Sequence, residues 1–369
     1  MDNMKIVTNR ESLLEPLQQI AGVVERRQTL PILANILINA GNGILQMTAT
    51  DLEVELKTQA NAECDGEADF TVPARKVLDI TKALPEGASI SLVVEGDKAK
   101  LQSGRSRFSL GVLSAQDYPV IEPTPSNTVL TIKEGLLKRL IEKTQFAMAQ
   151  QDVRYYLNGM LLEITKGEIK TVATDGHRLA LSKSNDSISD DVDIQVILPR
   201  KAVIELGRLL KDRDNEIKVE LNNNYIKILL ENSIFTSKLI DGRFPEYQRV
   251  MPSGSDKEVE AEKSTLRQSL SRASILSNEK YRGIRFSVQP NLLQLQAHNP
   301  EQEEAEEELE VDYQGDELKI GFNVGYLLDA ISAIDEDNVI IELKDSNSSA
   351  LIYGKGNSES RYVIMPMRI

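Results

Sequence analysis

The two histidines are the residues best suited to proton chemistry near neutral pH, and one of them stands in the suggestive segment Asp175-Gly176-His177-Arg178. A zinc site needs three or four ligands, and the chain offers only His177, His298 and the single Cys64 besides carboxylates. Neither a Gly-x-Ser-x-Gly elbow nor a Walker loop occurs in the sequence. We therefore expect no cofactor, no metal and no catalytic activity, with a magnesium-dependent nuclease as the enzymatic alternative.

Charge is distributed unevenly along the chain. The 369 residues include 43 basic and 57 acidic residues, for a formal charge of −14. Six segments with helical spacing of apolar residues nevertheless hold 20 basic and only 10 acidic residues. These segments are residues 10–27, 73–84, 133–146, 199–213, 263–282 and 322–334. Helices that pack on a sheet by their apolar sides would turn these basic residues outward, toward a partner such as a phosphate backbone.

Two observations limit this interpretation of the charge. Lysine and arginine are common on solvated helix faces, and the last of the six segments has no basic residue. The sequence also has no zinc-finger spacing, RNP motif or basic zipper, so any contact with DNA should go to its backbone and lack sequence specificity.

Landmarks in the sequence recur at a fixed interval. Pro73 and Pro199 each open an apolar helical segment and lie 126 residues apart, and Pro119 and Pro245 repeat that interval. A third, more diverged copy has Phe322-Asn323-Val324-Gly325 in place of the first proline motif. Self-similarity at this period predicts three repeated domains. Short β-rich runs between the helical segments predict an α+β fold, with two helices per repeat on one face of antiparallel sheets.

Composition agrees with an ordinary globular chain. Hydrophobic residues make up 41% and charged residues 27% of the sequence, and the single cysteine rules out an intrachain disulfide. We find neither a signal-peptide pattern at the N-terminus nor an apolar stretch of about 18 residues that could cross a membrane. We therefore expect a cytoplasmic protein.

Several long motifs resemble one known family from end to end. The chain contains Asp152-Val153-Arg154-Tyr155-Tyr156-Leu157-Asn158-Gly159-Met160, Ala173-Thr174-Asp175-Gly176-His177-Arg178-Leu179-Ala180 and the final Tyr362-Val363-Ile364-Met365-Pro366-Met367-Arg368-Ile369. Together with Asp241-Gly242-Arg243-Phe244-Pro245 and Leu276-Ser277-Asn278-Glu279-Lys280, they resemble the bacterial sliding clamps, the β subunits of DNA polymerase III.

The resemblance implies an architecture for the chain. Members of this family have three clamp domains per chain, expected here at residues 1–125, 126–253 and 254–369. Two chains join head to tail into a ring around duplex DNA, with helices lining the hole. A ring held on DNA by its topology can slide and needs only weak contacts, which suits an acidic protein. The expected location is the cytoplasm, in association with the nucleoid.

Ring closure would join one end of each chain to the opposite end of its partner. The resemblance assigns the interface to basic and apolar residues of the first repeat and to apolar and acidic residues of the third. They are Lys76, Arg105, Arg107, Phe108, Ile275, Leu276, Glu301, Glu303, Glu304 and Glu307. Taken without the family, such a glutamate run would be interpreted as a solvated face.

The family also has a hydrophobic cleft between its second and third domains that receives short linear motifs. The expected partners are the polymerase III alpha subunit, the clamp loader, translesion polymerases, mismatch-repair proteins and ligase. The matching positions here are Leu157, Thr174, Gly176, His177, Arg178, Leu179, Pro245, Arg249, Val250, Asn347, Ser349, Val363, Ile364, Met365, Pro366, Met367 and Arg368. Asn347 departs from the small apolar residue expected at its position.

For contact with double-stranded DNA, the resemblance points to basic and aromatic positions in all three repeats. They are Arg27, Arg75, Gln151, Tyr155, Tyr156, Lys201, Arg282 and Arg285. A monomeric peptide-binding scaffold that does not encircle DNA remains the alternative from another functional class.

Overall fold

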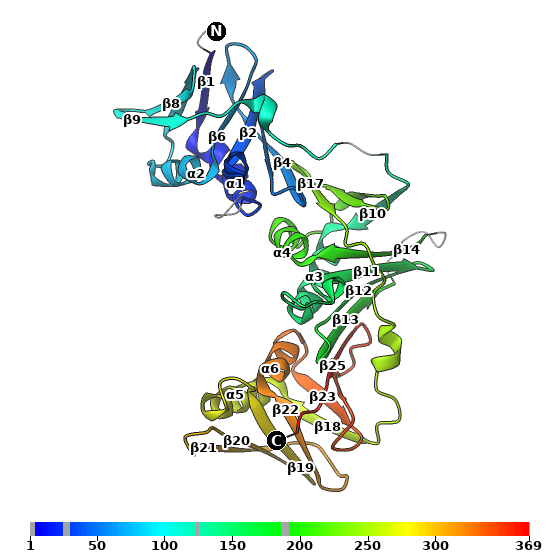
Figure 1. Ribbon diagram of the computed structural model, residues 1–369. Helices are drawn as coiled ribbons and strands as arrows, with labels where there is room; N and C mark the ends of the chain where they lie inside the picture. Colours follow the sequence, from blue (N-terminus) through cyan, green and yellow to red (C-terminus); the bar gives the residue numbers. More distant parts are fainter. Residues whose placement is uncertain (1–3, 25–29, 123–124, 186–191, 369) are drawn as a thin grey trace. The chain divides into compact units, whose positions relative to one another are not determined.

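The computed structural model describes residues 4–24, 30–122, 125–185 and 192–368. The chain divides into two compact units, Met1–Gly135 with Ile204–Leu239 and Leu136–Val203 with Ile240–Ile369. Each unit consists of antiparallel sheets with helices packed against them (Figure 1). Because this division runs through the central third of the chain, the limits expected for three domains stay a prediction.

The first unit contains a five-stranded and an eight-stranded sheet, in the orders β5-β1-β7-β8-β9 and β10-β15-β16-β17-β4-β3-β2-β6. Its strands are β1 (Met4–Asn9), β2 (Asn35–Gly41), β3 (Ile44–Thr50), β4 (Val54–Asn61), β5 (Glu63–Cys64), β6 (Ala68–Pro73), β7 (Ser89–Glu95), β8 (Lys98–Ser103), β9 (Ser106–Gly111), β10 (Thr128–Lys133), β15 (Glu216–Leu221), β16 (Tyr225–Leu229) and β17 (Ser233–Lys238). Helices α1 (Arg10–Ile20) and α2 (Ala74–Ala83) pack against each other, α1 on β4 and α2 on β2 and β6.

The second unit contains an eight-stranded and a four-stranded sheet, in the orders β14-β11-β12-β13-β25-β24-β23-β18 and β21-β20-β19-β22. Its strands are β11 (Gly159–Thr165), β12 (Glu168–Thr174), β13 (Arg178–Ser184), β14 (Asp193–Pro199), β18 (Lys257–Glu262), β19 (Gly283–Gln289), β20 (Leu292–His298), β21 (Glu304–Glu310), β22 (Leu318–Asn323), β23 (Asn338–Leu343), β24 (Ala350–Gly354) and β25 (Ser360–Ile364). Helix α5 (Lys263–Ala273) packs on β20 and β21 and against α6 (Val324–Ser332). Helices α3 (Glu134–Thr144) and α4 (Arg200–Leu209) have residues in both units.

All six expected helices are present, and each is shorter than its sequence segment. The apolar stripe of α1 is buried through Leu13, Leu17 and Ile20, as the helical spacing predicted. Pro73 is the N-cap of α2, where its missing N–H costs no hydrogen bond. The N-cap of α6 is instead Asn323, whose side-chain oxygen accepts hydrogen bonds from the Gly325 and Tyr326 amides. The predicted short strands are confirmed as β7, β15 and β23.

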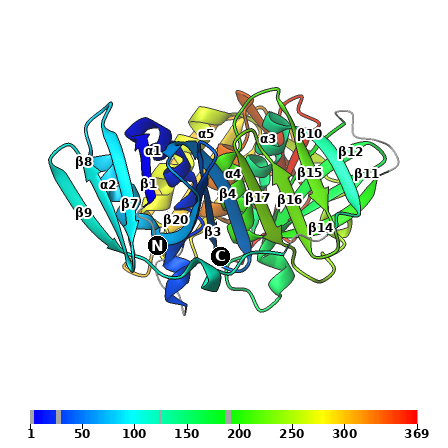
Figure 2. The ribbon, with the colours of Figure 1, turned by 90° about the horizontal axis from the view of Figure 1, so that it is seen from above.

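Strands from different repeats pair within each unit. In the first unit, β4 pairs with β17, and Leu56 lies opposite Phe235. Figure 2 shows β4, β17, β16 and β15 side by side in this sheet. In the second unit, β13 pairs with β25, and Ala180 lies opposite Tyr362. Each sheet is therefore continuous across the junction between two repeats.

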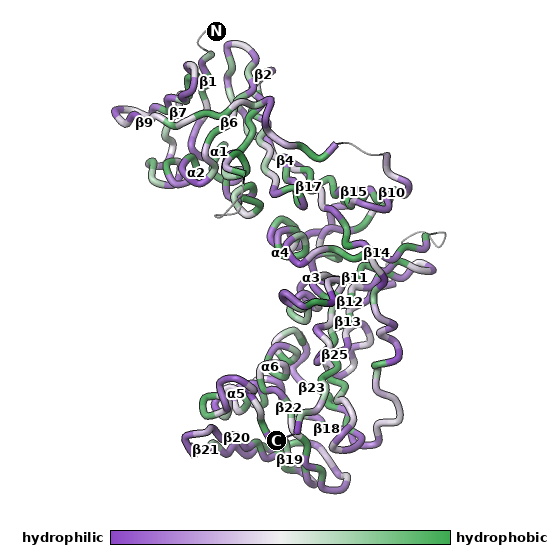
Figure 3. The backbone as a smooth tube through the Cα atoms, viewed as in Figure 1, coloured by the Kyte–Doolittle hydropathy of each residue, from purple (hydrophilic) through white to green (hydrophobic). Residues whose placement is uncertain are grey.

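Strands β9 and β21 each lie at the edge of a sheet. Among the described residues, β9 pairs only with β8, and β21 pairs only with β20. Their charges are opposite, because β9 carries Arg107 while β21 carries glutamate at most of its positions. Figure 3 shows the hydrophilic character of β21. None of the described helices is both long enough and apolar enough to cross a membrane.

Candidate functional site

A tight turn joins β12 to β13 and carries the Asp-Gly-His-Arg segment. The carboxylate of Asp175 accepts hydrogen bonds from the amides of His177 and Arg178, at 2.9 and 3.1 Å. The Thr174 hydroxyl donates to the Arg178 carbonyl at 2.6 Å and accepts from the Gly176 amide at 3.1 Å. Gly176 has φ +88°, a left-handed conformation that favours glycine. The turn is thus fixed by its own polar side chains, and Asp175 has a structural role in it.

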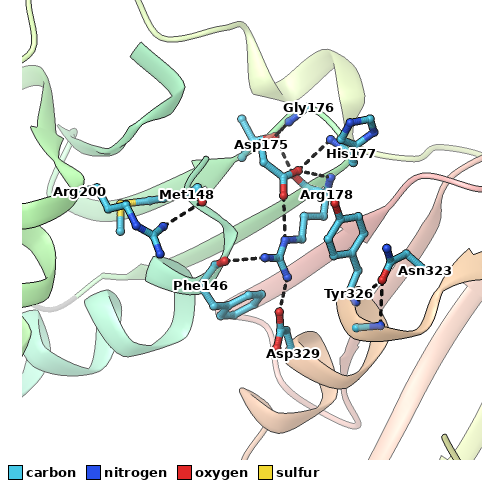
Figure 4. Close-up of polar contacts among 12 residues, drawn as sticks. Phe146, Met148, Asp175, Gly176, His177, Arg178, Arg200, Asn323, Tyr326 and Asp329 are labelled. Carbon is cyan, nitrogen blue, oxygen red and sulfur yellow. Dashed lines mark hydrogen bonds and ion pairs between the residues drawn. The ribbon is translucent and has the colours of Figure 1, made fainter. Parts of the chain in front are cut away.

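The guanidinium of Arg178 is held by several groups of the second unit (Figure 4). Its Nε donates to Asp175 at 3.1 Å, one Nη donates to the carbonyl of Phe146 at 2.7 Å, and the other donates to the Asp329 carboxylate. Tyr326 lies beneath it, with the guanidinium carbon 4.5 Å from the ring centroid. The side chain is only 12% exposed. The resemblance places Arg178 among the residues of the peptide cleft, and here its guanidinium makes hydrogen bonds to its own chain.

The C-terminal segment forms a second wall beside this turn. After β25, the Met365 amide donates to the His177 carbonyl at 2.9 Å, and the Met367 amide donates to the Gly321 carbonyl at 2.8 Å. The segment is therefore anchored on both sides by its backbone. Met365 is 39% exposed, whereas Val363 is buried. Flexible methionine at an exposed wall is suited to contacts with apolar side chains of varied shape.

The segment that leads into β18 contributes a further part of the same region. Phe244 and Tyr247 are buried in one apolar cluster with Leu179 and Val363. The Tyr247 hydroxyl donates to Glu163 at 3.0 Å, and burial together with this carboxylate raises the pKa of Tyr247 to about 12. The cluster anchors the segment on the sheet and leaves the neighbouring residues at the surface.

Exposure divides the expected cleft residues into a floor and a rim. Leu157, Thr174, Leu179, Val363 and Ile364 are buried, whereas Gly176, Arg178, Ser349, Pro366 and Met367 are partly buried. The exposed members are His177, Pro245, Arg249, Val250, Asn347, Met365 and Arg368. Asn347 lies in a turn in which its amide donates to Asp345 at 2.8 Å. All these residues belong to the second unit.

The structure adds aromatic and acidic neighbours that sequence analysis missed. The His177 ring stacks on Tyr326, with centroids 6.5 Å apart and an interplanar angle of 21°. Tyr326 and Asp329 are three residues apart and so share one face of α6. Phe146 follows α3 and presents its ring 5.4 Å from the Arg178 guanidinium. The i, i+3 pair of a tyrosine and an aspartate in an otherwise apolar helix was the available signal.

Comparison with known proteins identifies the family. Sequence models of the N-terminal, central and C-terminal domains of the DNA polymerase III beta subunit match residues 4–122, 131–246 and 248–368. The chain is 51% identical to the beta sliding clamp of Pseudomonas aeruginosa over 367 residues and 49% identical to that of Escherichia coli K12 over 369 residues. Each alignment covers 99% of this chain and 100% of the relative.

The chain belongs to the DNA polymerase III beta subunit family. A crystal structure of the Pseudomonas aeruginosa sliding clamp bound to griselimycin has a TM-score of 0.94 and 50% sequence identity to it, with complete coverage of both chains. The expected fold of three clamp domains is thus confirmed. The protein is a sliding clamp, a processivity factor that acts on DNA as a non-catalytic accessory subunit of DNA polymerase III.

The DNA-contact residues expected for a sliding clamp lie in both units. Arg75 is in the first unit, exposed, and donates to the Val24 carbonyl at 3.3 Å, while Arg27 lies outside the described residues. The second unit contains Gln151, Tyr155, Tyr156, Lys201, Arg282 and Arg285.

The two tyrosines among these residues, Tyr155 and Tyr156, have different surroundings. Tyr155 is 58% exposed and meets Tyr156 edge to face, whereas Tyr156 packs against the apolar cluster that contains Leu179. Tyr155 therefore has the accessibility that a DNA contact requires.

The expected interface residues of the clamp also lie at surfaces. Lys76, Arg105, Arg107, Ile275, Glu301, Glu303 and Glu304 are exposed, and Phe108, Leu276 and Glu307 are partly buried. Ile275 is 76% exposed, which is unusual for a large apolar side chain. Glu307 is already paired with Arg272 of the same chain at 2.6 Å, and this ion pair lowers the pKa of Glu307. The carboxylates of Glu304, Glu306 and Glu308 lie on the opposite side of β21 from Glu307.

Proposed function

We propose that two copies of this sliding clamp close into a head-to-tail ring around duplex DNA, in which β9 of each copy pairs with β21 of the other. The support comes from the pairing that the chain repeats inside its own units. Strands β17 and β25, which pair across repeats, begin at Ser233 and Ser360, and β9 begins at Ser106. These serines are spaced by 127 residues, so the three strands occupy equivalent positions in the repeats.

The partner strands are equivalent in the same way. Ala49 on β3 lies opposite Leu56 on β4, and Ala173 on β12 lies opposite Ala180 on β13. In the third repeat, Ala297 on β20 lies opposite Ala305 on β21. The three alanines are spaced by 124 residues. Strand β21 is therefore the counterpart of β4 and β13, and it is the one whose outer edge carries no described neighbour.

This equivalence gives the interface a definite register. Phe235 lies opposite Leu56 and Tyr362 lies opposite Ala180, so Phe108 should lie opposite Ala305 of the partner chain. In an antiparallel pair, Arg107 then faces Glu306, flanked by Glu304 and Glu308. The apolar side would bring Phe108 toward Ile275 and Leu276, because the 3-10 helix Ser274–Leu276 packs on β21.

Cysteine crosslinking tests the register. With Cys64 replaced by serine, Arg107→Cys combined with Glu306→Cys should give a disulfide-linked ring under mild oxidation. The control pair, Arg107→Cys with Glu310→Cys, should crosslink poorly, because two cysteines four positions out of register lie well beyond disulfide reach. Efficient crosslinking of the control alone would overturn the register, and a monomer in sedimentation would favour a scaffold that does not encircle DNA.

The apolar part of the interface should supply most of the affinity. Exposed ion pairs contribute only about 0 to 1 kcal/mol each, whereas truncating a buried isoleucine or leucine costs roughly 2 to 5 kcal/mol. We expect Ile275→Ala with Leu276→Ala to yield monomers in analytical ultracentrifugation. A double variant that stays dimeric at nanomolar concentration would contradict the assignment.

Retention on DNA tests the ring as a topological link. After loading by a clamp loader with ATP, the protein should remain on circular plasmid during gel filtration and be lost after linearisation. The contacts inside the ring would go to the phosphate backbone through Arg75, Lys201, Arg282 and Arg285, with Gln151, Tyr155 and Tyr156 beside them. Equal retention on both DNA forms would instead indicate ordinary binding. Because it acts on the chromosome, we place the clamp in the cytoplasm, in association with the nucleoid.

The region around His177 and Met365 is the proposed cleft for partner peptides. Its apolar floor, its exposed methionine and its anchored C-terminal wall suit the leucine or phenylalanine side chains of a short motif. Its occupants would be the polymerase III alpha subunit, the clamp loader, translesion polymerases, mismatch-repair proteins and ligase. Deleting Met365–Ile369 should abolish binding of labelled griselimycin and of a peptide from the alpha subunit while the dimer survives. Unchanged affinity would remove the assignment.

A further inference from the structure

The Arg178 guanidinium connects elements that are distant in sequence within the second unit. Arg178 opens β13, directly after the turn that carries His177, while Asp329 lies on α6 and Phe146 follows α3. The bond from Arg178 to Asp329 spans 151 residues of sequence. The guanidinium also lies within 4.5 and 5.4 Å of the ring centroids of Tyr326 and Phe146. A cation so enclosed gains from both rings as well as from its carboxylate partners.

The same residue supports the turn through its backbone. The Arg178 carbonyl accepts the Thr174 hydroxyl, and its amide donates to Asp175. The neighbouring His177 carbonyl accepts the Met365 amide of the C-terminal wall. A displacement of Arg178 would therefore move both the turn and the wall that is bonded to it. In Figure 4, Asp329 lies on the side of the guanidinium away from His177.

We propose that Asp329 is a positioning residue for the peptide cleft, acting through Arg178, an inference that rests on the cleft proposed above. Asp329 fixes the guanidinium against α6, and Arg178 fixes the turn that carries His177 and meets Met365. Arg178 is then a link between the two walls of the cleft, and its role is not to grip the peptide. Peptide affinity should therefore depend on the Asp329 carboxylate, which is not among the residues expected to contact the peptide.

Asp335 provides a matched control. Its carboxylate pairs with Lys143 of α3 at 2.6 Å, so it also joins the end of α6 to the elements before β11. It is 77% exposed, compared with 48% for Asp329, and its partner Lys143 is not part of the turn. Replacing Asp335 with alanine also removes an ion pair between an aspartate and a basic side chain. This pair, unlike that of Asp329, does not involve Arg178 or the turn that carries His177.

The experiment compares the affinity of labelled griselimycin for Asp329→Ala and Asp335→Ala in the full-length dimer. We expect Asp329→Ala to weaken binding roughly tenfold, as loss of a charge-assisted hydrogen bond would, and Asp335→Ala to change it by less than about twofold. Asp329→Glu should restore part of the loss. In an Arg178→Met background, Asp329→Ala should have no further effect, because the link is already broken.

The outcomes separate this inference from the cleft itself. If deletion of Met365–Ile369 abolishes binding while Asp329→Ala leaves it unchanged, the cleft stands and the positioning role is wrong. If neither change affects binding, the cleft assignment fails. Equal losses for Asp329→Ala and Asp335→Ala would mean a general loosening of the unit and would also overturn the proposal. Thermal unfolding of each variant, recorded alongside, shows whether the fold is intact.

Discussion

The turn between β3 and β4 has the same backbone design as the turn between β12 and β13, yet only the second is part of the proposed cleft. In the first, the Asp51 carboxylate accepts from the amides of Glu53 and Val54, at 2.9 and 2.7 Å. The Thr50 hydroxyl donates to the Val54 carbonyl at 2.9 Å and accepts from the Leu52 amide at 3.0 Å. These are the bonds that Thr174 and Asp175 make in the second turn. The two turns therefore share one backbone scaffold, and the difference between them lies in the side chains that this scaffold carries.

Three side chains make the difference between the two turns. Leu52, Glu53 and Val54 stand where the second turn has Gly176, His177 and Arg178. Val54 is completely buried, so the first turn ends in the apolar core of its own sheet. Arg178 at the matching position instead reaches α6. In the second turn, a long cation thus stands in place of a core residue and contacts α6 beside the proposed cleft.

The largest effect should come from giving the second turn the residue of the first. Gly176→Leu would force a side chain onto a residue at φ +88°, where its Cβ would lie 3.0 Å from an Nη atom of Arg154. We expect the free energy of unfolding of the second unit to fall by about 1 to 3 kcal/mol, together with loss of griselimycin binding. Urea denaturation and fluorescence binding measure the two effects. A variant with wild-type stability would mean that the turn can rearrange, contrary to its dense hydrogen bonding.

A matched pair of substitutions tests whether the two turns are equivalent. Thr50→Val and Thr174→Val each remove a hydroxyl that makes two hydrogen bonds while keeping the side-chain volume. Because both threonines are buried, each change should cost about 1 to 2 kcal/mol, with similar values at the two sites. Only Thr174→Val should also weaken peptide binding. Costs that differ by several kcal/mol would show that the surroundings, and not the turn, bear the stability.

The sequence predicted the repeated elements well because they depend on local patterns. The apolar stripe of α1, the proline before α2 and the β-rich run of β15 each act within a few residues. The matching Ala-Thr-Asp segments at 49–51 and 173–175 likewise encode their turns locally.

The contacts around Arg178 could not be predicted in the same way. Phe146, Tyr326 and Asp329 meet it only after strands and helices from different repeats have packed. The sequence therefore placed Arg178 among the residues of the proposed cleft but gave no indication of its partners within the chain, since these are set by tertiary structure.

Relief of strain in the first turn should produce a smaller effect of opposite sign. Leu52 has φ +78° and is 40% exposed, so its side chain gives little burial in return for an unfavourable backbone conformation. Leu52→Gly should raise the free energy of unfolding of the first unit by about 0.5 to 1 kcal/mol, since relief of left-handed strain exceeds the added flexibility of glycine. Urea denaturation is the measurement, with Leu113→Gly as a control at another exposed leucine. Destabilisation by Leu52→Gly would mean that the leucine makes contacts that outweigh its strain.

The smallest effect concerns the ion pair that lies against the second turn. Arg154 donates to the Asp152 carboxylate at 2.9 and 3.0 Å, which lowers the pKa of Asp152 to about 2 from its ordinary value near 3.8. A lowered pKa in the folded state means that the pair contributes fully above pH 4 and that its contribution is lost as the pH falls through 2. In a carboxyl-detected NMR titration, Asp152 should therefore show no protonation between pH 7 and 3.5, and Arg154→Gln should return its midpoint toward 3.8. A midpoint near 4 in the unaltered protein would indicate that Arg154 does not hold Asp152, and the crowding of Gly176 by Arg154 would then also be in question.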